Sequence, residues 1–170
     1  MILEGINTRR FHIRTILPTD DLNRYLKWMT DPEAYPFIES ASRNFSKVQL
    51  IDYLQEVTKS SNILQLGIYT LITDLHIGNI KFHDIDIEKK SSFVGFLIGE
   101  KDWQGRGVAS EVFLACSTYL KQNLGVETFQ LGVHRNHEQA IHSYLKMGFK
   151  KDDDLDSMDE RTIGMTYCVL

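Results

Sequence analysis

The sequence predicts a fold of the α/β (α+β) class, in which helices flank a mixed central sheet. Some segments alternate apolar and polar residues as strands do, and others repeat apolar residues once per helical turn. The two kinds of segment are interleaved in the order β-α-α-β-β-β-α-β-α-β-β, which is typical of a layered mixed sheet. The chain has 170 residues, 42% of them hydrophobic, without an internal repeat or linker. We therefore expect a single domain over residues 1–170.

The composition excludes several classes of protein. The net charge of -4 argues against broad binding to nucleic acid or to an anionic membrane. No N-terminal signal region and no apolar run near 18 residues is present, so the cytoplasm is the expected location. Cys116 and Cys168 are far apart and lie in apolar segments, which predicts two reduced core residues. Their spacing indicates no metal site.

The N-terminal part predicts one strand and two helices. Residues 10–17 alternate as a half-exposed strand, and residues 18–21 supply a turn with N-cap residues. The following helix carries apolar residues on one face and ends near Asp31, because a residue before proline disfavours the α conformation. After a loop, Ser46 is expected to cap a second helix, which ends at residues 59–62.

The middle of the chain predicts three strands. Residues 64–72 and 75–83 form a hairpin around a short turn, and residues 84–92 form a charged loop. The apolar run 94–98 suits a strand that is covered on both faces.

The C-terminal part returns to helices and strands. A long helix from Val108 is expected to stop at Gly125, and a strand follows at 128–133. A further helix over 139–147 ends at Gly148. The acidic run at 151–156 predicts a strand end or an exposed loop. Residues 162–170 are expected to form the last strand, and pairing of this strand with a second copy of the chain could form a homodimer.

A glycine-containing turn, Gln104-Gly-Arg-Gly-Val-Ala109, connects the strand at 94–98 to the long helix. Glycines let the backbone bend tightly, and several N–H groups at a helix start then point toward a bound anion. The turn therefore indicates a phosphate site, although many ordinary strand-to-helix turns look similar. It lacks the ending of a P-loop, and Ser110 stands where a dinucleotide fingerprint needs its third small residue.

The pattern formed by Gln104, Gly107 and Ala109 resembles the pyrophosphate loop of the GNAT N-acetyltransferase superfamily. Segments 76–82, 95–103 and 140–149 are similar to family segments in the corresponding places, so the resemblance covers nearly the whole chain. Asp21 and residues 28–31 resemble the branch with ribosomal-protein N-terminal acetyltransferases and amino-sugar or antibiotic acetyltransferases. The resemblance implies a GNAT-like sheet and acetyl-CoA as cosubstrate.

The resemblance also implies roles for individual residues. Tyr144 would protonate the departing thiolate, although a tyrosine on an amphipathic helix is more often a packing residue. A backbone amide near Leu97 or Ile98 would stabilise the oxyanion. The positions implied for acetyl-CoA binding are Phe96, Leu97, Ile98, Gln104, Gly105, Arg106, Gly107, Val108, Ala109, Asn136, His137 and Tyr144.

The sequence departs from the family pattern in two places. The family commonly has asparagine where this chain has His137, and Asn136 lies one residue earlier, so either residue is a candidate for that contact. Some relatives carry a glutamate base where this chain has Gly132.

If a side chain serves as general base, Glu100 and His83 are the candidates, with His134 behind them. The residues that could form the acceptor site are Trp28, Tyr35, Phe37 and His83.

These expectations lead to one main functional hypothesis. The chain would transfer an acetyl group from acetyl-CoA, by direct attack, to a primary amine of a small molecule such as an amino sugar or to a protein N-terminus. The alternative is a non-catalytic acyl-CoA-binding regulatory module, which the absent glutamate favours. A phosphate-binding domain unrelated to CoA would leave the 140–149 segment unexplained.

Overall fold

The structure is a computed structural model that describes residues 1–31, 36–37, 46–156 and 160–169. Its strands are β1 (Ile6–Asn7), β2 (Phe11–Thr15), β3 (Leu64–Thr70), β4 (His76–Asp86), β5 (Ser91–Ile98), β6 (Thr128–His134), β7 (Lys150–Lys151) and β8 (Thr162–Cys168). Its helices are α1 (Asn23–Met29), α2 (Lys47–Lys59), the 3-10 turn η2 (Lys101–Trp103), α3 (Val108–Leu124), α4 (Glu138–Met147) and α5 (Asp153–Asp156). The predicted mixed sheet with flanking helices is confirmed.

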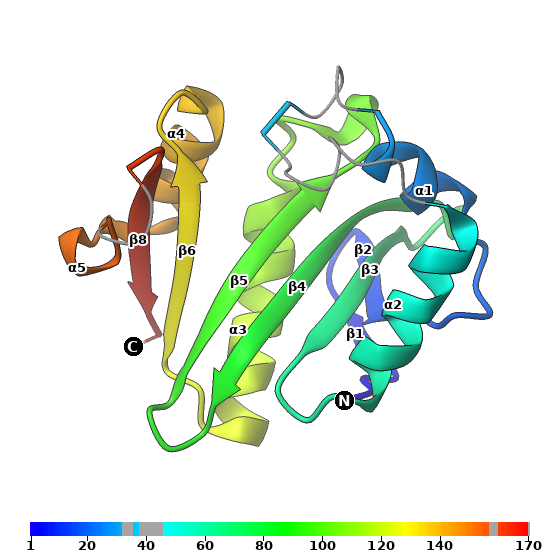
Figure 1. Cartoon of the computed structure of the whole chain (residues 1–170), viewed down its shortest axis with the longest axis horizontal. Helices are drawn as coiled ribbons and strands as arrows, with labels where there is room; N and C mark the ends of the chain where they lie inside the picture. The colour runs from blue at the N-terminus through cyan, green and yellow to red at the C-terminus, as the bar shows by residue number, and fades with distance from the viewer. Residues whose placement is uncertain (32–35, 38–45, 157–159, 170) are drawn as a thin grey trace.

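All eight strands belong to one sheet with the order β1-β2-β3-β4-β5-β6-β8-β7 (Figure 1). Every neighbouring pair is antiparallel except β5 and β6, which are parallel. The final strand β8 lies between β6 and β7, and β7 covers only Met165 and Thr166 of its second edge. Among the described helices, none is both long and apolar enough to cross a membrane.

Local sequence signals explain where most elements begin and end. Ser46 caps α2 as predicted, in a capping box in which Ser46 Oγ accepts the Gln49 backbone N–H and the Gln49 side chain accepts the Ser46 backbone N–H. Helices α3 and α4 end at Gly125 and Gly148, both in the left-handed conformation that glycine adopts most readily.

Three parts of the prediction were wrong or incomplete. The segment expected to be a charged loop from residue 84 is largely strand, because Asp86 pairs with Ser91 across a tight turn. The acidic run begins at the end of β7, as predicted, but continues into the short helix α5, since the Asp152 carboxylate accepts the Asp154 N–H as an N-cap does. β1 is too short to produce a periodic pattern.

Two hydrophobic clusters hold the helices against the sheet. The larger lies under α3 and α4 and includes Phe113, Phe129 and Phe149. The smaller lies under α1 and α2, where Trp28 is only 2% exposed. A Cβ added at Gly99 would meet the Trp28 ring at 2.0 Å, so this glycine lets α1 pack directly on the end of β5.

The two cysteines have different environments. Cys116 is buried in α3 as predicted, and burial raises the pKa of its thiol to about 12. Cys168 is exposed at the end of β8, so the prediction that it is a core residue was wrong. The apolar segment around it did not determine which face of the strand it occupies.

The parallel pair of strands separates soon after it begins. β5 and β6 pair only from Ser91 to Phe93 and from Thr128 to Gln130. Beyond these residues β5 stays paired with β4 and β6 stays paired with β8, so a wedge-shaped gap opens in the sheet (Figure 1).

Candidate active site

The glycine turn lies at the N-terminus of α3, beside the wide end of the gap. Gly105 and Gly107 have positive φ angles of 70° and 71°, and Gly107 is the N-cap of the helix. Within the described chain, no side chain caps this helix start. The amides of the turn and of the first helical turn therefore remain available to an anion at the positive end of the helix dipole.

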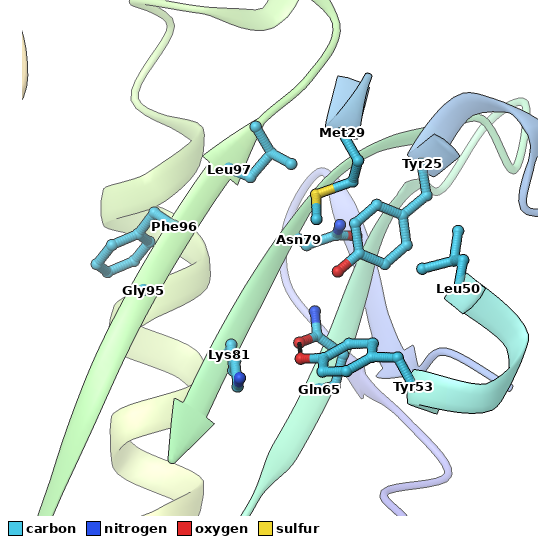
Figure 2. A pocket seen from close by; sticks show the side chains of 10 residues that line it. All are labelled: Tyr25, Met29, Leu50, Tyr53, Gln65, Asn79, Lys81, Gly95, Phe96 and Leu97. Carbon is cyan, nitrogen blue, oxygen red and sulfur yellow. Dashed lines mark hydrogen bonds between the residues drawn. The ribbon is translucent and has the colours of Figure 1, made fainter. Parts of the chain in front are cut away.

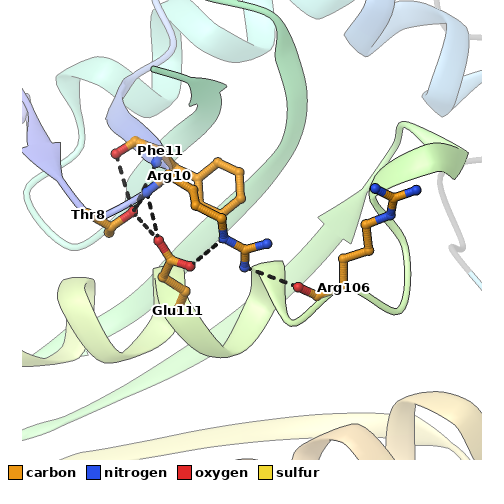
Figure 3. Close-up of polar contacts among 5 residues, drawn as sticks. All are labelled: Thr8, Arg10, Phe11, Arg106 and Glu111. Atoms are coloured by element: carbon orange, nitrogen blue, oxygen red, sulfur yellow. Dashed lines mark hydrogen bonds and ion pairs between the residues drawn. The ribbon is translucent and has the colours of Figure 1, made fainter. Parts of the chain in front are cut away.

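Gln104 connects this turn to the preceding strand. Its Nε2 donates a hydrogen bond to the Ile98 carbonyl at 2.9 Å. The side chain therefore holds the turn against the end of β5. Arg106 is exposed, and in Figure 3 its side chain extends away from Arg10.

A polar network braces the turn from the other side (Figure 3). Glu111 in the first turn of α3 accepts hydrogen bonds from Thr8 Oγ1 at 2.7 Å and from Arg10 Nε at 2.7 Å. Arg10 Nη2 also donates to the Arg106 carbonyl at 3.1 Å. Although burial acts to raise it, these hydrogen bonds hold the pKa of Glu111 below its usual value. Sequence analysis missed this network, because Arg10 and Glu111 are 101 residues apart.

The backbone of β5 presents alternate residues to the gap. The Gly99 N–H donates to the Ile77 carbonyl at 2.9 Å. Because successive residues of a strand direct their N–H and C=O groups to opposite edges, the odd-numbered residues of β5 direct theirs toward β4. The amides of Phe96 and Ile98 consequently face the gap, and β6 offers them no paired residue beyond Gln130. Leu97 pairs with Asn79 of β4, and its side chain packs in the cluster under α1 and α2.

Tyr144 lies on α4 and packs against the same strand. Its ring centroid is 5.6 Å from that of Phe96 and 5.9 Å from that of Phe149. Burial raises the pKa of the Tyr144 hydroxyl to about 12, so it stays protonated at neutral pH. Within the described residues the hydroxyl has no hydrogen-bond partner. The structure thus brings Tyr144 and Phe96 together, as a proton donor beside the gap requires.

Two histidines and one phenylalanine gather where β6 leads into α4. Phe37 stacks on His137 with ring centroids 4.3 Å apart and lies 5.3 Å from His134. Burial and the neighbouring His134 lower the pKa of His137. The Asn136 backbone N–H donates to His134 Nδ1 at 3.2 Å, and the exposed Asn136 side chain lies nearby.

The two candidate bases lie at opposite ends of β5. Glu100 follows the strand and forms a 2.7 Å ion pair with Arg24 of α1. His83 pairs with Phe93, near the closed end of the gap, and hydrogen-bonds Asp84 at 2.8 Å. Ile98 lies five positions after Phe93 along the strand, which is roughly 17 Å. The structure therefore does not bring His83 and Glu100 together.

A cavity of about 350 Å³ lies between the sheet and helices α1 and α2 (Figure 2). It is lined by Tyr25, Met29, Leu50, Tyr53, Gln65, Asn79, Lys81, Gly95, Phe96 and Leu97. Of the residues predicted for the acceptor site, Trp28 is buried and does not line this cavity, and Tyr35 lies outside the described residues. The alternation of β4, which puts Asn79 and Lys81 on one face, was the available signal.

No group of three or more metal-ligating side chains gathers within the described ranges. The region beside β5 offers backbone amides, the protonated Tyr144 hydroxyl and a strand edge. The turn offers N–H groups that suit a phosphate, and the strand edge offers the donors and acceptors that pair with the amide groups of an extended ligand.

Comparison with known families gives one match over most of the chain. Residues 10–150 match the family described as acetyltransferase (GNAT) domain.

Solved structures share the fold at low sequence identity. RimL, a ribosomal L7/L12 alpha-N-protein acetyltransferase solved with coenzyme A, superposes with a TM-score of 0.81 at 12% identity, covering 98% of both chains. MccE, a microcin C7 self immunity acetyltransferase solved with acetyl-CoA and AMP, gives 0.78 at 10% identity over 95% of this chain and 94% of its own. An acetyltransferase from Agrobacterium tumefaciens gives 0.77 at 18% identity, over 98% of this chain and 95% of its own.

Proposed function

Because this chain belongs to the GNAT acetyltransferase family, we propose that it is an acetyl-CoA-dependent N-acetyltransferase that acts on a primary amine. The acceptor would be a small molecule, such as an amino sugar, or a protein N-terminus. The observation that carries the proposal is the interrupted pairing of β5 and β6, which opens between the glycine turn and Tyr144. RimL and MccE, which share the fold, were solved with CoA or acetyl-CoA.

The residues around the gap suit acetyl-CoA. The amides from Gly105 to Ala109 would bind the pyrophosphate, and the Phe96 and Ile98 backbone would pair with the pantetheine arm. Acetyl-CoA supplies the activated thioester. Strand alternation favours the Ile98 amide over that of Leu97 as the donor to the thioester oxygen, because the Leu97 amide faces β4.

The proposed transfer has a simple balance of bonds and protons. The acceptor nitrogen uses its lone pair to form the C–N bond to the acetyl carbon, and the C–S bond breaks. Tyr144 donates its hydroxyl proton to the departing sulfur. The proton lost by the acceptor nitrogen passes to solvent, from which Tyr144 is reprotonated.

The proton on the acceptor must leave before attack. An α-amino group, with a pKa of about 8, is neutral far more often at pH 7 than a lysine amine, with a pKa of about 10.4. Glu100 is already paired with Arg24, and Gly132 offers no side chain. This arrangement favours an acceptor amine of lowered pKa that loses its proton to water.

The test is thiol release from acetyl-CoA across a panel of amino sugars, nucleotide-linked amino sugars, polyamines, aminoglycosides and peptides with free N-termini. We expect release that depends on the acceptor. Binding of acetyl-CoA by calorimetry without release would favour the non-catalytic regulatory module. Absence of binding would overturn the assignment of the glycine turn and the gap.

A further inference from the structure

We propose, on the basis of the function just proposed, that the cavity under α1 and α2 binds an anionic group of the acceptor. The acceptor would then be an amine that also carries a carboxylate or a phosphate. Four polar side chains in the cavity support this proposal, namely Lys81, Asn79, Gln65 and Tyr25 (Figure 2).

Lys81 supplies the positive charge. It lies on the face of β4 that points toward α1 and α2, and it is only partly exposed. Among the described residues, its ammonium group interacts with the Tyr53 ring, whose centroid is 5.3 Å from Lys81 Nζ. The described residues that line the cavity include no aspartate or glutamate. A positive charge in this setting is best stabilised by an anion that the ligand brings.

Asn79 supplies a buried donor. The residue is 4% exposed, and its Oδ1 lies 2.8 Å from His76 Nε2, which must be the donor because a carbonyl oxygen only accepts. Its Nδ2 is buried and has no hydrogen-bond partner among the described residues. An unpaired buried donor destabilises the folded state, so a native protein retains one where a ligand or water uses it.

The unbranched Met29 side chain lies over the Asn79 amide in Figure 2.

Gln65 and Tyr25 add further donors. Gln65 is 3% exposed, and its Oε1 accepts the Tyr53 hydroxyl at 3.2 Å, which leaves the NH₂ end of its amide for the cavity. The Tyr25 hydroxyl points toward Asn79 and Gln65 in Figure 2. Burial raises the pKa of Tyr25 far above neutral pH, so this hydroxyl is a donor as well. The polar surface is therefore dominated by donors, which suits carboxylate or phosphate oxygens.

The cavity also has the right place relative to the reaction. Gly95, Phe96 and Leu97 of β5 form one wall, and the opposite edge of the same strand faces the gap. A group held by Lys81 and Asn79 would leave the amine of a small acceptor near the end of β5, where the thioester is proposed to lie.

Matched pairs of amines test the proposal. An α-amino acid is compared with its amide, and an amino-sugar phosphate with the free amino sugar, in the thiol-release assay. We expect kcat/KM to be at least tenfold higher for the anionic member of one pair, and the pair that shows the preference distinguishes carboxylate from phosphate. Lys81→Met should lose most of this preference by raising KM for the anionic amine, whereas Lys81→Arg should keep it.

The control is Lys89→Met, because Lys89 is exposed on the β4–β5 turn and should leave the preference unchanged. The proposal would be overturned if the wild type had the same kcat/KM for the neutral and anionic members of each pair. It would also be overturned if Lys81→Met lowered kcat/KM equally for both members.

Calorimetry with the same amines separates this proposal from the proposed function. Binding of an anionic amine by the wild type but not by Lys81→Met supports the cavity even without acetyl transfer. Failure of every carboxylate- and phosphate-bearing amine to bind the acetyl-CoA-saturated protein would overturn the proposal while leaving CoA binding intact.

Discussion

At the scale of single residues, Tyr144 combines two environments that rarely occur together. Its ring is packed against Phe96 and Phe149, and its hydroxyl has no partner within the described chain. The packing explains why its pKa is raised to about 12, and the unpaired hydroxyl explains how it could serve as a proton donor.

Replacing Tyr144 by phenylalanine removes only the hydroxyl. We expect kcat to fall about 10²- to 10⁴-fold, the usual contribution of a general acid, while acetyl-CoA affinity stays nearly unchanged. Steady-state kinetics and calorimetry measure the two effects. Tyr167→Phe is the matched control, because Tyr167 also contacts Phe149 but lies on β8. An unaffected kcat in Tyr144→Phe would exclude the general-acid role.

Contacts between residues far apart in the chain were the hardest to predict from the sequence. Tyr144 and Phe96 were both expected at the cofactor site, and they are neighbours in the structure. The cavity residues Asn79 and Lys81 were missed, because alternation in a strand shows which residues share a face but not which helix covers it. The contact between Phe37 and His137 depends on tertiary packing that no local pattern encodes.

At the scale of elements, the glycine turn works as part of a unit that includes β5 and α3. Its two left-handed glycines set the direction of the amides. Gln104 holds one side of the turn to Ile98, and Arg10 holds the other side at the Arg106 carbonyl. The Arg106 carbonyl and the Gly107 N–H belong to the same peptide group and point in opposite directions. Because Arg10 holds the carbonyl on its own side, the Gly107 N–H points away from β2.

Gly105→Ala tests the conformation of the turn. The φ of 70° is strained for alanine, so we expect a loss of about 1 kcal/mol in unfolding free energy and a raised KM for acetyl-CoA. Gly125→Ala is the control, because it has a φ of 72° at the other end of α3 and equally open surroundings. Both variants should lose similar stability in urea unfolding. A raised KM in both would show that the effect is not local to the turn.

Arg10→Lys tests the brace. Lysine cannot donate to Glu111 and the Arg106 carbonyl in the same forked geometry, so we expect KM for acetyl-CoA to rise about fivefold to tenfold with kcat retained. Arg14→Lys is the control, since Arg14 forms an ion pair of the same length, 2.7 Å, with Asp20 away from the turn. An unchanged KM in Arg10→Lys would mean that the turn keeps its shape without the brace.

The elements themselves were largely predictable, because local signals define them. Ser46, Gly125 and Gly148 marked helix ends correctly. The short helix α5 and the extension of β4 were not predicted, since each depends on one side chain that satisfies backbone groups, Asp152 in α5 and Asp86 in the hairpin.

At the scale of the whole molecule, the buried His76 links stability to pH. It contacts Tyr25, Trp28 and Tyr69 under α1, and burial lowers its pKa although its hydrogen bond to Asn79 acts in the opposite direction. In the unfolded chain a histidine has a pKa of about 6.5. At pH values between the lowered pKa of folded His76 and the unfolded pKa, the unfolded state binds more protons than the folded state. The free energy of unfolding therefore rises with pH over this range and is lost as the pH falls through it.

We therefore expect the unfolding free energy to decrease from pH 7.5 to pH 5.5, with at most about 1.4 kcal/mol per pH unit from His76. Urea unfolding at several pH values measures the slope. His76→Gln should flatten it in part, and His137, whose pKa is also lowered, accounts for some of the remainder. The exposed His142→Gln is the control. An identical slope in wild type and His76→Gln would contradict this account.

The short ladder between β5 and β6 also has a mechanical consequence. Three residue pairs join the β1–β5 part of the sheet to the part formed by β6, β8 and β7, and past them the parts have separate edges. A pantetheine arm bonded to one edge and packed against the other would fasten these parts together. Occupancy would then stiffen the open end of the sheet, and each release of product would loosen that end again.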